Sequence, residues 1–174
     1  METRRLAWWK LFTVWGLFLA LHFSYETFPN TLFRLIGEDG ETTFFHMKML
    51  FFAYVFVTLV ELAVRWSRLE SRSDFVCSRA LIAVAYPWLA ITMWFSAEAL
   101  GFAMPSMAVE IVYANVTTAL GIYLALRMEE ALDPVRMRVA LKAMLVLVFL
   151  CAVLAYVSFS FKTPMPFFVT PPGF

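Results

Sequence analysis

Residues 143–161, AMLVLVFLCAVLAYVSFSF, run for 19 positions without a charged side chain. About 20 apolar residues in a helix are enough to cross the ~30 Å hydrocarbon layer of a bilayer. The rest of the chain agrees, because 62% of its 174 residues are hydrophobic and only 16% are charged. One soluble core of this size does not bury so much apolar surface. The sequence therefore predicts an all-α integral membrane protein that contacts the lipid bilayer.

Four more apolar windows of similar length precede this run. Thr42 and Thr43 are suited to cap the helix that follows them, and Asp133-Pro134 is suited to open the last helix. Pro87 lies inside the third window, where its missing amide hydrogen predicts a kink or a locally re-paired backbone. The sequence predicts a single bundle of five transmembrane helices over residues 1–161, with spans at about 6–25, 44–66, 79–100, 106–127 and 138–161.

Lysine and arginine are unevenly divided between the two sides of this predicted bundle. One side receives eleven of these cations and the other receives three, which are Arg34, Lys48 and Lys162. Cytoplasmic loops carry the excess of Lys and Arg, so we expect a protein of the inner membrane with its N-terminus in the cytoplasm. An odd number of spans then puts the C-terminus outside. Residues 162–174 hold four prolines and predict an extended tail there.

Composition and motifs argue against several classes of function. The net charge is +1, and the cations form short clusters rather than a stripe, so nucleic acid is not an expected partner. Cys77 and Cys151 make neither a disulfide framework nor a zinc-binding spacing. The sequence has no Walker A motif, glycine-rich dinucleotide turn or nucleophile elbow, which disfavours nucleotide-driven chemistry and a serine hydrolase.

Ionisable residues inside or at the edge of a transmembrane span indicate a candidate functional site, because placing a charge at mid-helix costs roughly 2.5–3.5 kcal/mol on insertion scales. Several of them fall at one depth, near the outer boundary of the predicted bundle, and four different spans contribute. This arrangement predicts a polar, ligand-binding pocket at the outer face. The predicted ligand-binding residues are His22, Glu26, Glu41, His46, Lys48, Glu98 and Glu110.

Spacing suggests how some of these residues interact. His22 and Glu26 are four apart, so on one helix they share a face, and the glutamate can orient the imidazole. Lys48 lies near the positive end of its helix dipole, which is unfavourable unless a carboxylate or an anionic ligand is close. The alternative is that all of them are interfacial groups that reach headgroup water, where charges cost little. The candidate carboxylates for Lys48 are Glu41, Glu98 and Glu110.

Polar and small residues elsewhere in the spans have simpler explanations. Glu61 and Arg65 have the spacing and order of a helical ion pair. Asn115, like Thr117 and Thr118, is expected to hydrogen-bond between helices, and Gly121 to allow close packing.

Three kinds of chemistry suit the predicted pocket. Two histidines with carboxylates are ligands for a divalent metal such as zinc, iron or manganese, although no fixed metal-binding spacing is present. His22 and His46 at matched depth also suit the two axial ligands of a haem. The third class is a binding or transport role, in which the pocket takes a lipid headgroup, a small solute or a partner subunit, with Lys48 contacting an anion.

The order of short motifs resembles a family of small prokaryotic multi-pass membrane proteins that is defined only as a domain of unknown function. The matching residues are HFSYE at 22–26, GETTFFHMK at 40–48, VEI at 109–111 and TPMPFF at 163–168. The chain has Phe44-Phe45 where the family has Trp-Glu, which removes one carboxylate. The resemblance implies a shared architecture and an outer cluster of His22, Glu26, Glu41, His46, Lys48 and Glu110. It implies no activity.

The preferred interpretation is a multi-pass inner-membrane protein with a binding or accessory role. It would carry a small ligand or serve as a subunit of a larger membrane complex or homo-oligomer. The alternative is a metal- or haem-dependent membrane enzyme or redox protein that uses His22 and His46. The sequence alone leaves open whether the protein is an enzyme.

Overall fold

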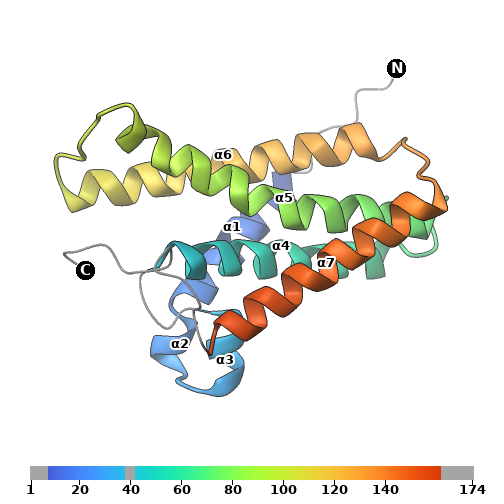
Figure 1. Ribbon diagram of the computed structural model, residues 1–174, viewed down its shortest axis with the longest axis horizontal. Coiled ribbons are helices and arrows are strands. Elements are labelled where there is room, and N and C mark those ends of the chain that lie inside the picture. The colour runs from blue at the N-terminus through green and yellow to red at the C-terminus, as the bar shows by residue number, and fades with distance from the viewer. Residues whose placement is uncertain (1–7, 38–41, 162–174) are drawn as a thin grey trace.

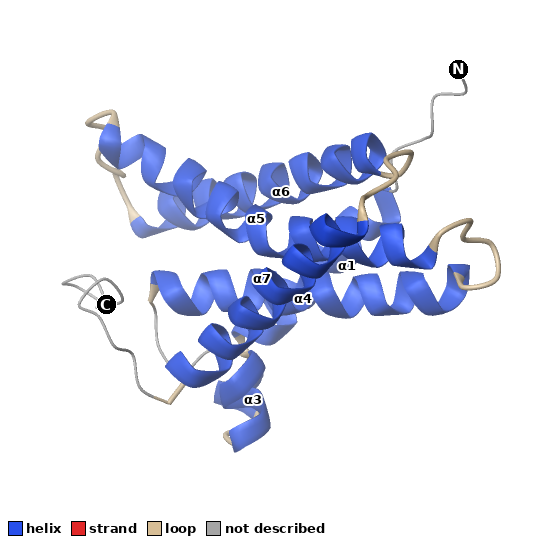
Figure 2. Cartoon of the chain, turned by 45° about the vertical axis from the view of Figure 1, so that its right-hand side comes forward, coloured by secondary structure: helices blue, strands red, loops and turns tan. Residues whose placement is uncertain are grey.

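The computed structural model describes residues 8–37 and 42–161 of the chain. Within these residues all regular structure is helical and no strand occurs (Figures 1 and 2). The prediction of an all-α protein is therefore confirmed for the part of the chain that the structure describes. The helices are α1 (Trp8–His22), α2 (Ser24–Thr27), α3 (Thr31–Ile36), α4 (Thr43–Arg65), α5 (Arg72–Ala99), α6 (Met107–Leu132) and α7 (Val139–Phe159).

Four helices in the described residues, not five, are long and apolar enough to cross a membrane: α4, α5, α6 and α7. The predicted count of five is wrong because α1 has only 15 residues. At ~1.5 Å of rise per residue such a helix is roughly 22 Å long, short of the ~30 Å hydrocarbon layer. The short helices α2 and α3 follow it, mostly between the spans predicted at about 6–25 and 44–66. By helix length and hydropathy the chain is a candidate multi-pass membrane protein.

Side-chain caps define where the long helices begin. α4 starts directly after Thr42, whose hydroxyl accepts a hydrogen bond from the Phe45 amide at 3.3 Å, as predicted. Ser71 and Ser106 cap α5 and α6 in the same way. The expectation that Asp133-Pro134 opens the last helix is wrong, because Asp133 ends α6 and α7 begins only after a further loop.

α5 is longer than the span predicted for it. It begins at Arg72 rather than near residue 79 and runs for 28 residues, without a break at Pro87. The additional first turns place Asp74 on the helix, and both Asp74 and Arg79 are buried. Asp74, which lies before the predicted span, is therefore a buried residue of α5.

α4 runs antiparallel to α1 and to α5, and α6 runs antiparallel to α5 (Figure 1). Lys10, near the start of α1, contacts the last turns of α4 and α6. The end of α1 lies against the start of α4, where the ring centroids of His22 and His46 are 5.4 Å apart. α5 and α6 form a hairpin in which Arg79 reaches Asp133. We call the end that holds Lys10, Arg79 and Asp133 the charged end, and the end that holds His22 and His46 the pocket end.

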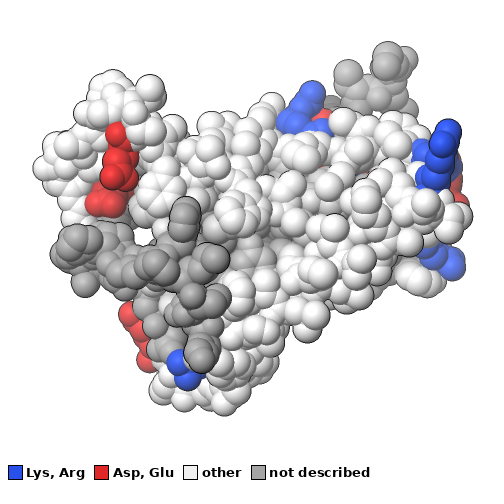
Figure 3. Space-filling model, in the orientation of Figure 1, with Lys and Arg blue, Asp and Glu red and all other residues white. Residues whose placement is uncertain are grey.

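α7 crosses the other helices diagonally (Figure 1). Near its start Lys142 contacts Asp74 of α5 at 2.8 Å, and near its end Tyr156 packs against Phe51 of α4, with ring centroids 4.9 Å apart. Its outer surface is apolar and exposed, as at Val139, which is 83% exposed. On the face seen in Figure 3, charged side chains gather toward the two ends and leave an uncharged surface between them. This distribution is what a lipid-facing surface requires.

The middle of the bundle is tightly packed. A Cβ atom added at Gly121 of α6 would lie 2.9 Å from the Cβ of Ala90 on α5, so the predicted close packing at Gly121 is confirmed. The Tyr86 hydroxyl of α5 donates a hydrogen bond to the Leu50 carbonyl of α4 at 2.8 Å. This dense layer separates the charged end from the pocket end.

Candidate functional site

A pocket of about 410 Å³ lies between α1, α4, α5 and α6 in the pocket end of the bundle. Its walls are mainly apolar and include Phe18, Leu50, Ile91 and Trp94. A volume of this size suits a small molecule. The polar residues that line it are His22, Thr43, His46, Glu110, Asn115, Thr117 and Thr118.

The two histidines face each other across the boundary between α1 and α4. Their ring centroids are 5.4 Å apart with the rings inclined by 40°, and Trp94 lies 6.2 Å from His46. His46 Nδ1 is 2.9 Å from the carbonyl oxygen of Thr42. A carbonyl only accepts, so Nδ1 carries the proton of a neutral His46 ring and Nε2 carries the lone pair. The cap of α4 thereby sets the tautomer of the histidine one turn further on.

Asn115 forms part of the wall that α6 contributes. Its side-chain amide donates to the Ile111 carbonyl at 2.8 Å, and its oxygen accepts from Trp15 Nε1 at 3.2 Å. The bond to Trp15 joins α6 to α1, as predicted for a polar residue between helices. Thr117 instead donates within α6, to the Tyr113 carbonyl at 3.0 Å, so the expectation of an interhelical bond is wrong for its hydroxyl. Asn115 therefore has a fixed orientation at the inner edge of the pocket.

The structure brings together only part of the predicted ligand-binding set. His22, His46 and Glu110 line the pocket. Glu26 and Glu98 are exposed, and neither lines it. α1 ends at His22 and Glu26 belongs to α2, so the two residues do not share the face of one helix as predicted. Glu41 lies outside the described residues.

Lys48 is on a different face of α4 from His46. It is fully buried, and its ammonium donates to the Arg34 carbonyl at 2.8 Å and to the Ser160 hydroxyl at 3.0 Å. The same ammonium lies 4.5 Å from the centroid of the Phe45 ring. Lys48 joins α4 to α3 and to the end of α7, and it does not line the pocket. Among the described residues, Lys48 and His46 therefore do not share one pocket, and a contact of Lys48 with an anion stays a prediction.

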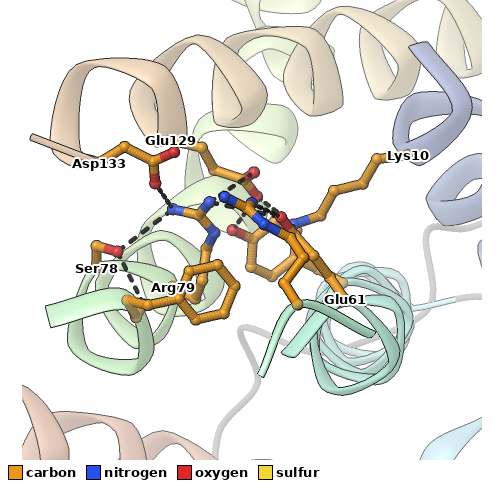
Figure 4. Close-up of polar contacts among 9 residues, drawn as sticks. Lys10, Glu61, Ser78, Arg79, Glu129 and Asp133 are labelled. Carbon is orange, nitrogen blue, oxygen red and sulfur yellow. Dashed lines mark hydrogen bonds and ion pairs between the residues drawn. The ribbon is translucent and has the colours of Figure 1, made fainter. Parts of the chain in front are cut away.

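A second group of polar side chains lies at the charged end (Figure 4). Lys10 contacts two carboxylates, Glu61 at 2.5 Å and Glu129 at 2.6 Å. The Tyr54 hydroxyl donates to the same Glu129 oxygen at 2.5 Å, and Arg79 donates to Asp133 at 2.9 Å. Glu61 also accepts from Arg65 at 2.5 Å, which confirms the predicted helical ion pair. We call this group the ion-pair cluster; its charged members are Lys10, Glu61, Arg65, Arg79, Glu129 and Asp133.

Most of the cluster is inaccessible to solvent. The Lys10 side chain is 0% exposed and that of Arg79 is 3% exposed. Taking such charges out of water costs several kcal/mol per ion, and only close ion pairs with good hydrogen-bond geometry offset this cost. The three cations and three carboxylates of the cluster balance in formal charge. The ion pairs of the cluster thus connect four helices, α1, α4, α5 and α6, at the charged end of the bundle.

Sequence reasoning did not find this cluster. Lys10 and Arg79 were grouped with the loop cations, and Glu129 was not singled out. One signal was present, because Lys10 interrupts the apolar stretch WWKLF and an ionisable residue within a span is functional or paired by default. Its partners could not be read from the chain, since Glu61 and Glu129 lie 51 and 119 residues away.

The described residues contain no group of three or more His, Cys, Asp and Glu side chains that could hold a metal ion. The fold and hydropathy define a candidate multi-pass membrane protein with a pocket at one end and buried ion pairs at the other. Comparison of the chain with family models, curated proteins and solved structures finds no match. The family resemblance of the sequence stays a prediction.

Proposed function

We propose that the protein binds a small, mainly apolar ligand with one polar group in the pocket between α1, α4, α5 and α6. The observation that carries this proposal is the lining itself, in which a few polar side chains, among them His22, His46 and Glu110, lie in a mainly apolar cavity of about 410 Å³. Ligand sites in proteins are concave and mainly apolar, with a few polar groups that fix orientation.

The polar lining suggests the chemistry of the ligand's head. Imidazole rings both donate and accept hydrogen bonds, and a carboxylate accepts. A hydroxyl, amine or amide head would satisfy these groups, while an apolar body would pack against Phe18, Leu50 and Trp94. This is the binding role that the sequence favoured, with Lys48 removed from the site.

Filling the pocket should abolish binding. Ala114 lines the pocket on α6, so Ala114→Phe puts an aromatic ring where the ligand would lie. We expect small molecules that copurify with the native protein, identified by mass spectrometry, to fall at least tenfold in this variant. Val112→Phe is the matched control, because Val112 is on the same helix, 63% exposed and outside the pocket. Equal retention of the same molecules by both variants would contradict the proposal.

We also propose that the charged end faces the cytoplasm of the cell and that the membrane is the inner membrane. The described cations of this end, including Arg65, Arg79 and Arg136, outnumber those of the pocket end, Arg34 and Lys48. Cytoplasmic faces carry such an excess. With the four spans α4 to α7, the start of α4 and the end of α7 would then both lie on the outer side. A cytoplasmic N-terminus requires in addition that α1 brings the chain from the charged end, where Lys10 lies, to the pocket end, where His22 lies.

A transition metal held by His22 and His46 is the second candidate. Zn–N bonds of ~2.0–2.1 Å to two imidazoles in tetrahedral geometry place the ring centroids about 5 Å apart, close to the observed 5.4 Å. The two rings supply two ligands, and the remaining positions would be open to water or substrate. Glu110, in the first turn of α6, is the carboxylate that lines the same pocket.

Removing one imidazole tests the metal candidate. We expect His46→Ala to weaken Zn²⁺ binding to purified protein, measured by calorimetric titration, at least tenfold, because half of the protein ligands are lost. Glu98→Gln is the control, since Glu98 is exposed at the same end and outside the pocket. Unchanged Zn²⁺ affinity in a His22→Ala/His46→Ala double variant would rule this candidate out.

A further inference from the structure

The ion-pair cluster joins two halves of the bundle that also form the two walls of the pocket. One half is α1 with α4, which carry Lys10, Tyr54, Glu61 and Arg65 in the cluster and His22 and His46 in the pocket. The other half is α5 with α6, which carry Arg79, Glu129 and Asp133 in the cluster and Trp94, Glu110 and Asn115 in the pocket. Pocket and cluster are therefore opposite ends of the same interface.

Each half keeps ion pairs of its own. In the α1–α4 half Glu61 accepts from both Lys10 and Arg65, each at 2.5 Å. In the α5–α6 half Arg79 lies 2.9 Å from Asp133 and 3.4 Å from Glu129. Every charged member of the cluster thus has an opposite charge within its own half.

Only a few polar contacts of the cluster cross between the halves. They are the bond from Lys10 to Glu129 at 2.6 Å, the bond from Tyr54 to Glu129 at 2.5 Å and the longer pair of Arg79 with Glu61 at 3.8 Å. Separating the halves at the charged end would break these contacts and leave a formal charge of +1 on the α1–α4 half and −1 on the α5–α6 half, although each charged side chain would keep one opposite charge beside it. A buried charge left without a partner is what makes breaking an ion pair costly.

The contacts between the halves at mid-depth are of a different kind. Tyr86 of α5 bonds the Leu50 carbonyl of α4, and Trp15 of α1 bonds Asn115 of α6. Both bonds lie between the pocket and the cluster, so a passage from the pocket to the charged end requires the halves to part at this layer as well. α7 runs diagonally across both halves, contacting α5 at the charged end and α4 at the pocket end.

We propose that the ion-pair cluster is a gate, and that the protein is a carrier whose pocket opens alternately to the pocket end and to the charged end. This proposal rests on the binding function of the pocket. The structure represents the state in which the gate is closed, with Lys10 fully buried between Glu61 and Glu129. Opening breaks the bonds of Glu129 to Lys10 and Tyr54 and also parts the two mid-depth bonds of Tyr86 and Trp15, and the ligand leaves between the separated halves.

Access of a thiol reagent to the pocket tests the gate. Thr118→Cys puts a reporter thiol in the pocket lining, in a chain whose native cysteines are replaced by Cys77→Ala and Cys151→Ala. A membrane-impermeant cationic methanethiosulfonate is added to either side of sealed vesicles. Val139→Cys, 83% exposed at the charged end, identifies which side is which. We expect labelling of the reporter from both sides, and slower labelling from the charged end.

Two variants loosen the gate, and a third serves as the control. Tyr54→Phe removes one bond between the halves and leaves every charge in place, and Glu129→Gln weakens both bonds to this residue. We expect each to speed labelling from the charged end about tenfold, while labelling from the pocket end is unchanged. Arg127→Gln removes an exposed ion pair with Glu130 at the same end of α6 and should change neither rate.

The outcomes separate the gate from the pocket. If the reporter reacts from the pocket end but never from the charged end, even in Tyr54→Phe, the pocket has one opening and the carrier proposal is wrong while binding stands. An equal acceleration by Arg127→Gln would also overturn it, because the effect would not belong to the cluster. A reporter that reacts from neither side would count against an accessible pocket, and so against the binding function as well.

Discussion

Replacing Arg79 with methionine should lower the free energy of unfolding by about 3–5 kcal/mol, the usual cost of removing one partner from a buried ion pair. Arg79 is the cation of the α5–α6 half of the cluster, 3% exposed, and it contacts Asp133 and Glu129 on α6. Methionine preserves most of the apolar volume but leaves the two carboxylates facing each other without it. Equilibrium unfolding in detergent, followed by far-ultraviolet circular dichroism, measures the change.

The same substitution at Arg127 is the matched control for Arg79→Met. Arg127 pairs with Glu130 at 2.7 Å, but it is 57% exposed, so its loss should cost at most about 1 kcal/mol. Arg79→Lys should recover part of the loss, because an ammonium keeps the charge but does not reproduce the two-pronged contact of a guanidinium. A cost for Arg79→Met no larger than that for Arg127→Met would mean that the cluster contributes little to stability.

The helices could be predicted from the sequence because their signals are local. The apolar run of α7 and the cap at Thr42 are contained in a few consecutive residues, and both were found. α1 was predicted too long because apolar residues continue to Tyr25, whereas the helix ends at His22 and α2 begins at Ser24. The helix is interrupted at Phe23, and hydropathy does not report such an interruption.

The candidate site could be predicted only in part, and the phase of α4 explains one of the errors. His46 and Lys48 were placed in one pocket because they are close in sequence and at one depth. Residues two apart on a helix point in different directions, and so His46 faces α1 and α5 while Lys48 faces α3 and α7. The depth of a residue in the membrane follows from the predicted topology. The side of the helix on which it lies depends on the rotation of the helix about its axis, which the topology does not give.

The ion-pair cluster shows where sequence reasoning stops. Glu129 precedes Glu130 near a helix end, and the two are alike in sequence. In the structure Glu129 is 7% exposed and bonded to Lys10, whereas Glu130 pairs with the exposed Arg127. Which of the two enters the bundle depends on how α1 docks against α6, a contact between residues more than a hundred positions apart.

Replacing Gly121 with leucine should lower the free energy of unfolding by about 3 kcal/mol, at the upper end of the usual cost of overpacking a core. A Cβ at this position would lie 2.9 Å from the Ala90 Cβ and 3.3 Å from its Cα, closer than side chains pack. α5 and α6 would have to separate at mid-depth. Ala90 also lines the pocket, so ligand retention should fall in the same variant.

A size exchange between the two helices distinguishes this packing effect from a loss of helix flexibility. Gly121→Ala alone should cost about 1 kcal/mol, measured by the same unfolding experiment in detergent. Combining it with Ala90→Gly removes the atom that the new methyl group meets, because the 2.9 Å contact is between the two Cβ positions. We therefore expect the double variant to be more stable than the sum of the two single changes predicts. If the two costs simply add, the helices do not approach each other at this point, and the dense layer that separates the pocket from the ion-pair cluster would have to be held by Tyr86 and Trp15 instead.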